Sequence, residues 1–229
     1  MDESMNKQAS CISKENPYCE LAQSYLDCIR GSSRNEAVRL ILDAVNRGVD
    51  IQDIYMYVFQ PVQYEMGRLW LANQISIAQE HYCTAVTQLI MSHLYPRIMT
   101  FEKNGLSMVA CCVGGELHEL GIRMVTDLLE MKGWDTYYLG ANMPEKEVVR
   151  SVKDQNVHLL AVSATLTSNR PRVEAIIKEV RQTPGLEGVK IMVGGHAFLQ
   201  EPGGWEKIGA DGSAMDAVQA VELAFSLCS

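Results

Sequence analysis

From Leu106 onward, short apolar runs typical of strands alternate with hydrophobic patterns at helical spacing. The clearest runs span 108–113, 135–139, 159–163 and 189–193, and a short fifth strand is expected near 209–212. The helical patterns span about 120–132, 144–154, 170–182 and 213–227. This alternation predicts a parallel sheet with helices on both faces. We therefore expect an α/β domain with a flavodoxin-like, Rossmann-like sheet of five strands in the order 2-1-3-4-5.

The first part of the chain has a different periodicity. Between residue 18 and about residue 100, apolar residues recur at helical spacing, with interruptions at Gly31, Gly48 and Pro61. This pattern predicts a bundle of four or five helices, the last of which starts at Ser76 and is ended by Pro96. Residues 1–17 are polar and predict a flexible tail. The predicted domains are a helical bundle over 18–103 and the α/β domain over 104–229.

Composition argues against several classes of function. A net charge of −8 disfavours direct binding of nucleic acid, which needs concentrated lysine and arginine. The seven cysteines are odd in number and contain no Cys-x-x-Cys pair, which suits reduced cytoplasmic thiols better than a disulfide framework. No apolar run is long enough to span a bilayer. We therefore expect a cytoplasmic protein that binds neither membranes nor nucleic acid.

The segment Glu116-Leu117-His118-Glu119-Leu120-Gly121 directly follows the first predicted strand. Open α/β sheets bind ligands at the carboxyl ends of their strands, so His118 lies where a ligand is expected. A neutral imidazole is a good ligand for a transition metal, and Glu116 is placed to fix its tautomer. Gly121 has no Cβ, which lets a bulky ligand approach the backbone. The same six residues also fit a helix-capping turn with one exposed histidine.

Two further loops are predicted at the same edge of the sheet. Ser163 and Thr165 follow the third strand, and Gly194-Gly195 follows the fourth. Strands one, three and four are neighbours in the predicted order, so these loops converge beside His118. Serine, threonine and glycine are common in caps and turns. Together they also predict a groove with hydroxyls and bare backbone, suited to a nucleotide-like tail.

The carboxylate-x-His-x-x-Gly motif, these loops and the segment 209–213 together resemble the cobalamin-binding domain of corrinoid proteins. The resemblance covers nearly all of residues 18–227. It implies that His118 is the lower axial ligand of cobalt, replacing the cofactor's own base, with Glu116, Leu117 and Gly121 beside it. It also implies that the displaced tail of cobalamin is buried in the groove, where the matching residues are Ser163, Thr165, Gly194 and Gly195.

In the helical part, Trp70 is followed after nine residues by Glu80-His81. This pattern resembles the light-sensing cobalamin photoreceptors of the CarH type. The resemblance implies that Trp70, Ile77, Glu80 and His81 lie over the upper face of adenosylcobalamin. It implies a non-enzymatic light sensor that signals through a protein partner, a transcriptional regulator or signalling protein, after photolysis of the cobalt–carbon bond. Taken alone, a tryptophan at a helix end is more often part of a core, and Glu-His in a first turn more often faces solvent.

Two features depart from that family, and alternatives stay open. Leu71 stands where the best-known members have a histidine, so water or His81 would occupy the upper site after illumination. The sequence contains no helix-turn-helix segment, so control of transcription would require a partner.

The main alternative is a corrinoid protein that carries methyl groups for a methyltransferase system, because such proteins share the two-part architecture. A zinc hydrolase built from His118, His196 and Glu116 is a third interpretation. Homo-oligomerisation is left open.

Overall fold

The computed structural model describes residues 10–199 and 203–228. The chain divides into two compact units, Met1–Tyr95 and Pro96–Ser229. The predicted boundary lay after residue 103. Lys103 belongs with the second unit because its ammonium group donates hydrogen bonds to Glu130 Oε1 (2.8 Å) and to the carbonyl oxygen of Trp134 (3.1 Å). Each unit is described by itself.

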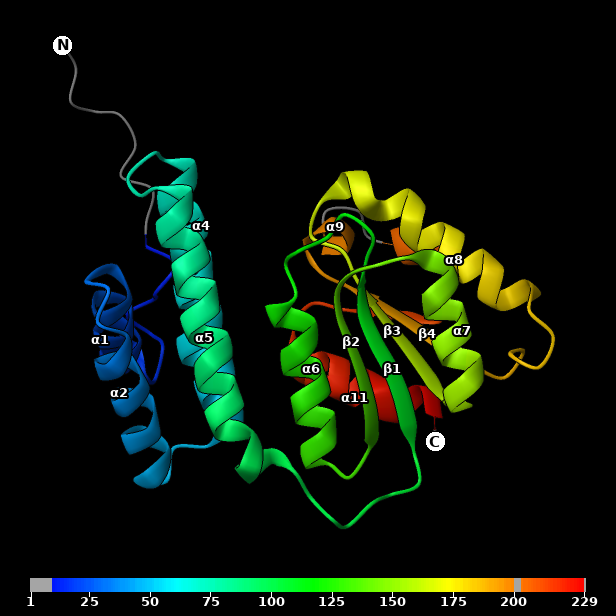
Figure 1. The fold of residues 1–229 in the computed structure, drawn as a ribbon, viewed down its shortest axis with the longest axis horizontal. Coiled ribbons are helices and arrows are strands. Elements are labelled where there is room, and N and C mark those ends of the chain that lie inside the picture. The colour runs from blue at the N-terminus through cyan, green and yellow to red at the C-terminus, as the bar shows by residue number, and fades with distance from the viewer. Residues whose placement is uncertain (1–9, 200–202, 229) are drawn as a thin grey trace. The chain divides into compact units, whose positions relative to one another are not determined.

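The first unit is helical, as the sequence predicts (Figure 1). Tyr25 lies in its core, where the hydroxyl group shares a hydrogen bond of 2.8 Å with Thr87 and the ring packs 5.3 Å from the ring of Phe59. The helices are α1 (Cys19–Arg30), α2 (Arg34–Asn46), α3 (Ile51–Asp53), the π-helical segment η1 (Ile54–Phe59), α4 (Gln60–Leu71) and α5 (Ile77–Ile98).

Neither Pro61 nor Pro96 ends a helix. The backbone runs without a break from Ile51 to Leu71, and the π-helical η1 directly precedes Pro61. Proline cannot donate the usual i→i−4 hydrogen bond and its ring crowds the preceding turn, so the wider π-helical turn accommodates it. Pro96 also lies inside its helix, because α5 extends to Ile98. The prediction that Pro96 ends this helix is therefore wrong.

Residues 10–17 contact the helical unit, in contrast to the predicted flexible tail. Ile12 is buried, and the backbone N–H of Cys11 donates to Glu65 Oε2 at 2.9 Å. The side-chain amide of Asn16 donates to the carbonyl oxygen of Tyr57. The rest of that predicted tail, residues 1–9, lies outside the described residues.

The second unit contains a parallel sheet in the order β2-β1-β3-β4-β5, which confirms the predicted topology. The strands are β1 (Ser107–Val113), β2 (Asp135–Met143), β3 (Leu159–Ser163), β4 (Lys190–Gly194) and β5 (Gly212–Ala214). The longer helices are α6 (Leu120–Met131), α7 (Glu145–Gln155), α8 (Arg170–Gln182) and α11 (Ala217–Cys228). Three short ones are η2 (Thr167–Asn169), α9 (His196–Leu199) and α10 (Gly204–Lys207).

The sheet has helices on both faces, with α6 and α11 on one side and α7 and α8 on the other (Figure 1). Val109, Cys111 and Val113 of β1 pack into the core that α7 and α8 cover. The intervening residues of β1 are buried as well. Burial on both faces explains why this strand is continuously apolar in sequence. Because all strands are parallel, their carboxyl ends lie at one edge, and the candidate site lies there.

Two further observations concern the whole described chain. All seven cysteines are free thiols. None of the helices in residues 10–199 and 203–228 combines the length and the apolar character needed to cross a membrane.

Candidate functional site

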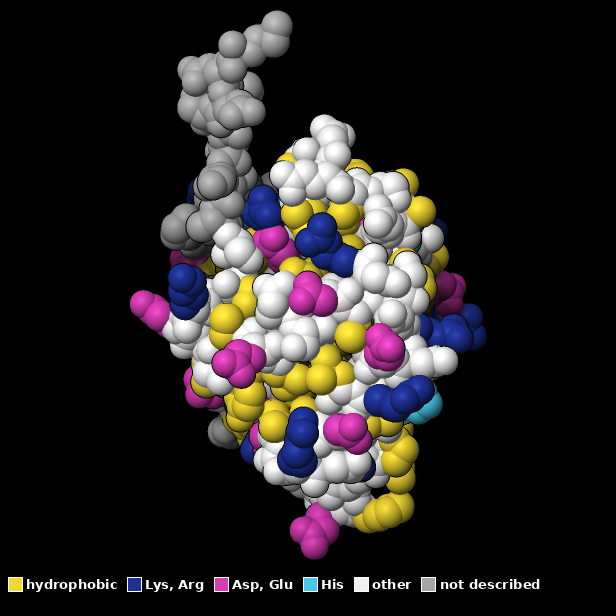
Figure 2. Space-filling model, turned by 90° about the vertical axis from the view of Figure 1, so that its left-hand side faces the viewer, with side chains coloured by type: hydrophobic (Ala, Val, Ile, Leu, Met, Phe, Trp, Pro, Cys, Tyr) yellow, Lys and Arg dark blue, Asp and Glu magenta, His cyan; other side chains and the backbone are white. Residues whose placement is uncertain are grey.

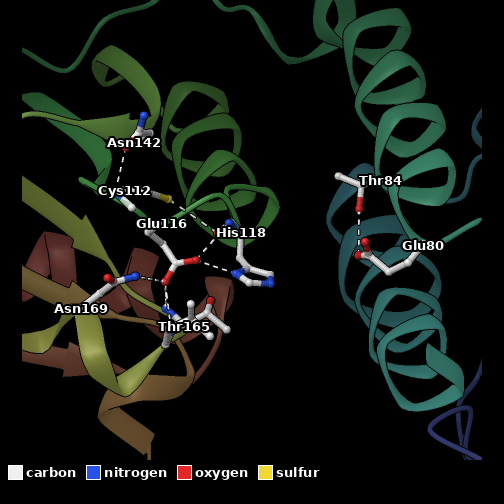
Figure 3. A network of polar contacts seen from close by, with 10 residues as sticks. Glu80, Thr84, Cys112, Glu116, His118, Asn142, Thr165 and Asn169 are labelled. Atoms are coloured by element: carbon white, nitrogen blue, oxygen red, sulfur yellow. Dashed lines mark hydrogen bonds and ion pairs between the residues drawn. The ribbon is translucent and has the colours of Figure 1, made fainter. Parts of the chain in front are cut away.

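The loop between β1 and α6 carries Glu116 and His118. Glu116 is fully buried, whereas the His118 side chain is 56% exposed. Glu116 Oε1 accepts a hydrogen bond from the backbone N–H of His118 at 3.1 Å and lies 2.5 Å from His118 Nδ1 (Figure 3). An ionised carboxylate only accepts hydrogen bonds, so Nδ1 carries a hydrogen, and in the neutral imidazole the lone pair is therefore on Nε2. The loop therefore presents an exposed imidazole with a defined tautomer.

The other oxygen of Glu116 is held by the loop that follows β3. Oε2 accepts hydrogen bonds from the backbone N–H groups of Thr165 (2.8 Å) and Leu166 (3.0 Å) and from Asn169 Nδ2 (3.1 Å). Burial by itself raises the pKa of a carboxyl group. Here hydrogen bonds from the Leu166 backbone, His118 and Asn169 outweigh it and lower the pKa of Glu116 to about 2. Glu116 is thus ionised at neutral pH and fixed in place.

The surroundings of His118 fit a bulky ligand with an apolar face. A Cβ placed on Gly121 would meet no atom within 4 Å, so the space beside the start of α6 is open. Leu117 and Leu166 are exposed apolar side chains on the two adjoining loops. An imidazole with a carboxylate behind it is a common arrangement of a histidine that binds a transition metal. The residues present therefore fit a cobalt corrinoid whose metal is bound by Nε2.

Sequence reasoning missed Asn142, which holds the same loop from β2. Its side-chain Oδ1 accepts a hydrogen bond from the N–H of Gly115 at 2.7 Å, and its own N–H donates to the carbonyl oxygen of Glu116 at 3.0 Å. Asn142 has a φ of 55°, a left-handed conformation that asparagine tolerates better than most residues. It was missed because the strand was predicted to end at residue 139, whereas β2 extends to Met143 through two register shifts.

The predicted groove residues contribute in different ways. Thr165 was chosen for its hydroxyl group but acts through its backbone N–H on Glu116. Ser163 is mostly buried. Gly195 has a φ of 91°, and a Cβ there would collide with the carbonyl oxygen of Ala164 and lie 3.1 Å from Ser163 Oγ. Gly194 accepts a hydrogen bond from the N–H of Ala164 at 3.0 Å. The ends of β3 and β4 are therefore closely joined.

The candidates in the helical unit lie at the end of α4 and in the first turns of α5. Trp70 and Ile77 are exposed, with 43% and 55% of their surface accessible. Glu80 Oε2 lies 3.0 Å from His81 Nδ1, and the Thr84 hydroxyl group donates to Glu80 Oε1 at 3.4 Å (Figure 3). Trp70 is therefore not a core residue of this unit.

The zinc-hydrolase interpretation has no ligand set in residues 10–199 and 203–228. No group of three histidine, cysteine, aspartate or glutamate side chains is clustered there in a way that could hold a metal ion. A protein-only zinc site usually needs at least three such ligands.

Two family models match the chain, both described as a B12 binding domain. One covers residues 106–222 and the other covers residues 21–95. The two matches coincide closely with the α/β unit and the helical unit.

Curated relatives match over almost the whole chain. Dimethylamine corrinoid protein 1 of Methanosarcina acetivorans is 27% identical over 94% of this chain and 99% of its own length. Trimethylamine corrinoid protein 1 of Methanosarcina mazei is 29% identical over 90% of this chain and 97% of its own length. Among solved structures, the monomethylamine corrinoid protein of Methanosarcina barkeri has the same fold, with a TM-score of 0.80 at 23% identity over 92% of this chain and 99% of that one.

These matches overturn the prediction of a CarH-type photoreceptor. The relatives are named as corrinoid proteins of methylated amines, so light sensing and signalling to a transcriptional regulator are not supported. The error has a physical reason. The Trp70-x9-Glu80-His81 pattern describes only the end of one helix and the start of the next, in a bundle that methyl-carrying corrinoid proteins also have. Leu71, the departure already noted, is 76% exposed and cannot bind a metal.

The same matches support the predicted cofactor class and the predicted two-part architecture. The α/β model alone matches more than half of the chain, and the helical model matches most of the rest. The geometry of Glu116 and His118 fits the same cofactor. The chain belongs to the B12-binding domain family, and its cofactor is a cobalamin or a related corrinoid.

Proposed function

We propose that this protein carries methyl groups, bound to the cobalt of its corrinoid, between partner methyltransferases. The observation that carries the proposal is the end-to-end match of both units to corrinoid proteins named for dimethylamine and trimethylamine. When bound, the corrinoid would supply a cobalt centre that can hold a methyl group for transfer between partner proteins. The upper ligand in this proposal is a methyl group rather than the adenosyl group that we first expected.

In this proposal, His118 Nε2 would hold the cobalt, and Glu116 keeps the hydrogen on Nδ1. The exposed side chains of Leu117 and Leu166 and the open space beside Gly121 accommodate the corrin ring. The loops at Ser163, Thr165, Gly194 and Gly195 accommodate the nucleotide tail.

The helical unit also contributes to binding in this proposal, because its residues 21–95 match a B12 binding domain independently of the sheet. Trp70, Ile77, Glu80 and His81 are the residues that we propose contact the corrinoid. Exposed tryptophan and isoleucine side chains supply apolar area at little cost in conformational entropy.

The chain is a group carrier in this proposal, and its partner proteins supply the catalysis. Its partners are methyltransferases rather than regulators of transcription, and it works in the cytoplasm. The net charge of −8 agrees with a partner other than nucleic acid.

The proposal is tested by loading. The purified chain is reconstituted with cobalamin, the cobalt is reduced, and carbon-labelled methyl iodide is added before gel filtration. We expect about one labelled methyl group per bound cobalt to elute with the protein, and we expect a purified thiol-dependent corrinoid methyltransferase of a methanogen to remove it. Protein that binds cobalamin but retains no methyl label would contradict methyl carriage. The variant His118→Ala shows how much label depends on the proposed ligand.

A further inference from the structure

A groove in the helical unit is lined by basic and apolar side chains. It lies between α2 and α5, two helices that are labelled in Figure 1, and has a volume of about 520 Å³. Its lining residues are Arg34, Asn35, Val38 and Arg39 of α2 and Leu89 and His93 of α5. Among the described residues, no aspartate or glutamate lines this groove.

Helical spacing brings these side chains together. Residues four apart lie on the same face of a helix, as do Arg34 and Val38 on α2 and Leu89 and His93 on α5. Val38 is half-buried and Leu89 is 37% exposed, so both present apolar surface to the groove. The groove therefore combines apolar surface with charged and polar groups.

The two arginines of the groove keep their charge unpaired. Within residues 10–199 and 203–228, the side chains of Arg34 and Arg39 form no ion pair or hydrogen bond. Asp43 lies one turn beyond Arg39 on α2 but neither lines the groove nor pairs with either arginine. Arg68 of α4, by contrast, forms an ion pair with Glu65. The groove is thus a local positive site on a chain of net charge −8.

The beginning of α2 adds hydrogen-bond donors to the groove. Arg34 and Asn35 are the first two residues of this helix, and the N-cap residue Ser33 makes no side-chain capping hydrogen bond. Backbone N–H groups of a first turn have no acceptor within their own helix, and the helix dipole makes this end positive. Guanidinium and backbone N–H groups are the donors that carboxylates accept most strongly.

We propose that the groove between α2 and α5 is a docking site for an acidic segment of a partner methyltransferase. The inference rests on the proposed function, which requires such partners. A chain of net charge −8 repels an acidic protein over most of its surface, so one positive groove determines where an acidic segment binds. The apolar side chains of Val38 and Leu89 favour a protein segment that combines carboxylates with hydrophobic residues over a small anion.

Charge reversal in the full, cobalamin-loaded chain tests this role. Arg34→Glu and Arg39→Glu each replace an unpaired positive charge of the groove with a negative one. Arg47→Glu is the matched control, because it makes the same change of charge at an exposed arginine that follows α2 and does not line the groove. A general repulsion between two acidic proteins would affect all three variants alike.

The first measurement is a titration with octaglutamate, followed by the amide NMR spectrum of the protein. We expect the peptide to shift signals of α2 and α5, and we expect octaglutamine to shift none. The dissociation constant should rise about tenfold or more in Arg34→Glu and Arg39→Glu, and less than about twofold in Arg47→Glu. Salt at about 0.5 M should weaken binding to the wild type, because exposed charges are screened.

The second measurement uses the carrier as a substrate. The thiol-dependent methyltransferase removes the labelled methyl group at increasing concentrations of the loaded chain. We expect Arg34→Glu and Arg39→Glu to raise the KM for the carrier about fivefold or more with kcat unchanged, because docking precedes transfer and the groove takes no part in the chemistry. Arg47→Glu should stay within about twofold of the wild type.

The outcomes separate the groove from the proposed function. If octaglutamate leaves α2 and α5 unshifted, or binds all three variants alike, the groove does not hold acidic segments. If the peptide binds but the KM values of all three variants agree, the partner docks elsewhere. If gel filtration shows a dimer of the wild type that only Arg34→Glu and Arg39→Glu dissociate, a second copy occupies the groove. Each of these results overturns the inference. If the wild type retains no methyl label, methyl carriage fails, whatever the peptide titration shows.

Discussion

Each unit of this protein contains a buried glutamate whose pKa is strongly lowered, Glu65 in the helical unit and Glu116 in the α/β unit, and the two are held in different ways. Glu65 in the helical unit forms a two-point ion pair with Arg68, at 2.7 and 3.0 Å, and accepts the N–H of Cys11. Glu116 in the α/β unit is held by backbone N–H groups, an asparagine amide and the imidazole of His118. The pKa of each is lowered to about 2, in Glu65 chiefly by the Arg68 hydrogen bond and in Glu116 by hydrogen bonds that outweigh burial.

The difference between the two glutamates indicates which of them supports a functional side chain. The charge of Glu65 is neutralised by Arg68, which lies three residues further along the same helix. The charge of Glu116 is stabilised by dipoles and one exposed imidazole, which leaves that imidazole electron-rich at its free nitrogen. Figure 2 shows a face of the molecule on which hydrophobic side chains are exposed among scattered charged ones.

The largest expected effect comes from removing the proposed ligand. His118→Ala should weaken binding of methylcobalamin by at least about tenfold, because even a change behind a metal ligand commonly costs about 10–100-fold. Titration of the apo-protein, followed by the visible spectrum, measures this. His93→Ala, which removes an exposed histidine of α5, is the control and should bind normally. An unchanged affinity in His118→Ala would mean that His118 is not the ligand, and Glu116 would then have no functional role that Glu65 lacks.

The matched pair Glu116→Gln and Glu65→Gln tests the comparison directly. Glutamine offers one acceptor oxygen where the carboxylate offers two, so one set of donors faces an NH₂ group in each variant. We expect each to lower the free energy of unfolding by about 1–3 kcal/mol. Only Glu116→Gln should also weaken cobalamin binding, by about tenfold or more. Urea unfolding and cofactor titration of both variants provide the measurement, and equal losses of affinity would contradict the distinction.

How much of the fold and of the site could be predicted depends on how far apart in the sequence the contacting residues lie. The strand order and the place of His118 follow from local periodicity and from a motif within six residues, so they were predicted. The contact between Glu116 and His118 is also local, two residues apart in the sequence, and the structure has Glu116 Oε1 2.5 Å from His118 Nδ1.

Long-range partners could not be predicted in the same way. Asn169 lies 53 residues from Glu116, and its place before a helix suggests a cap rather than a contact with another loop. Asn142 was hidden by the underestimated length of β2. In the helical part, residue spacing alone could not distinguish a photoreceptor from a methyl-carrying corrinoid protein, because both have a helical bundle before the cobalamin-binding domain.

Acid should affect both glutamates, and the sign follows from their lowered pKa values. Each has a pKa of about 2 in the folded chain, against 4.5 for an unperturbed glutamate, so each contributes stability that is complete above about pH 4.5. That contribution is lost as the pH falls towards 2, up to about 3 kcal/mol for each group. Urea unfolding at pH 7, 4.5 and 3 measures the loss. Both glutamine variants should show a weaker dependence on pH below 4.5 than the wild type, and an unaltered dependence would contradict the lowered pKa values.

The smallest expected effect concerns Trp70 and the role of the helical unit. Trp70 is 43% exposed, so Trp70→Ala removes a side chain that is about half buried and should lower the free energy of unfolding by about 1–3 kcal/mol. If its indole contacts the corrinoid as proposed, affinity for methylcobalamin should fall by about two- to fivefold, a loss that thermal unfolding of the apo-protein would not reveal. Tyr64→Ala is the matched control, since Tyr64 is a 57% exposed aromatic residue of the same helix, α4, whose hydroxyl group accepts a hydrogen bond from Gln60. Equal affinities in the two variants would mean that Trp70 makes no special contact and that the α/β unit supplies the tight binding. A loss confined to Trp70→Ala would show that the helical unit takes part in holding the cofactor.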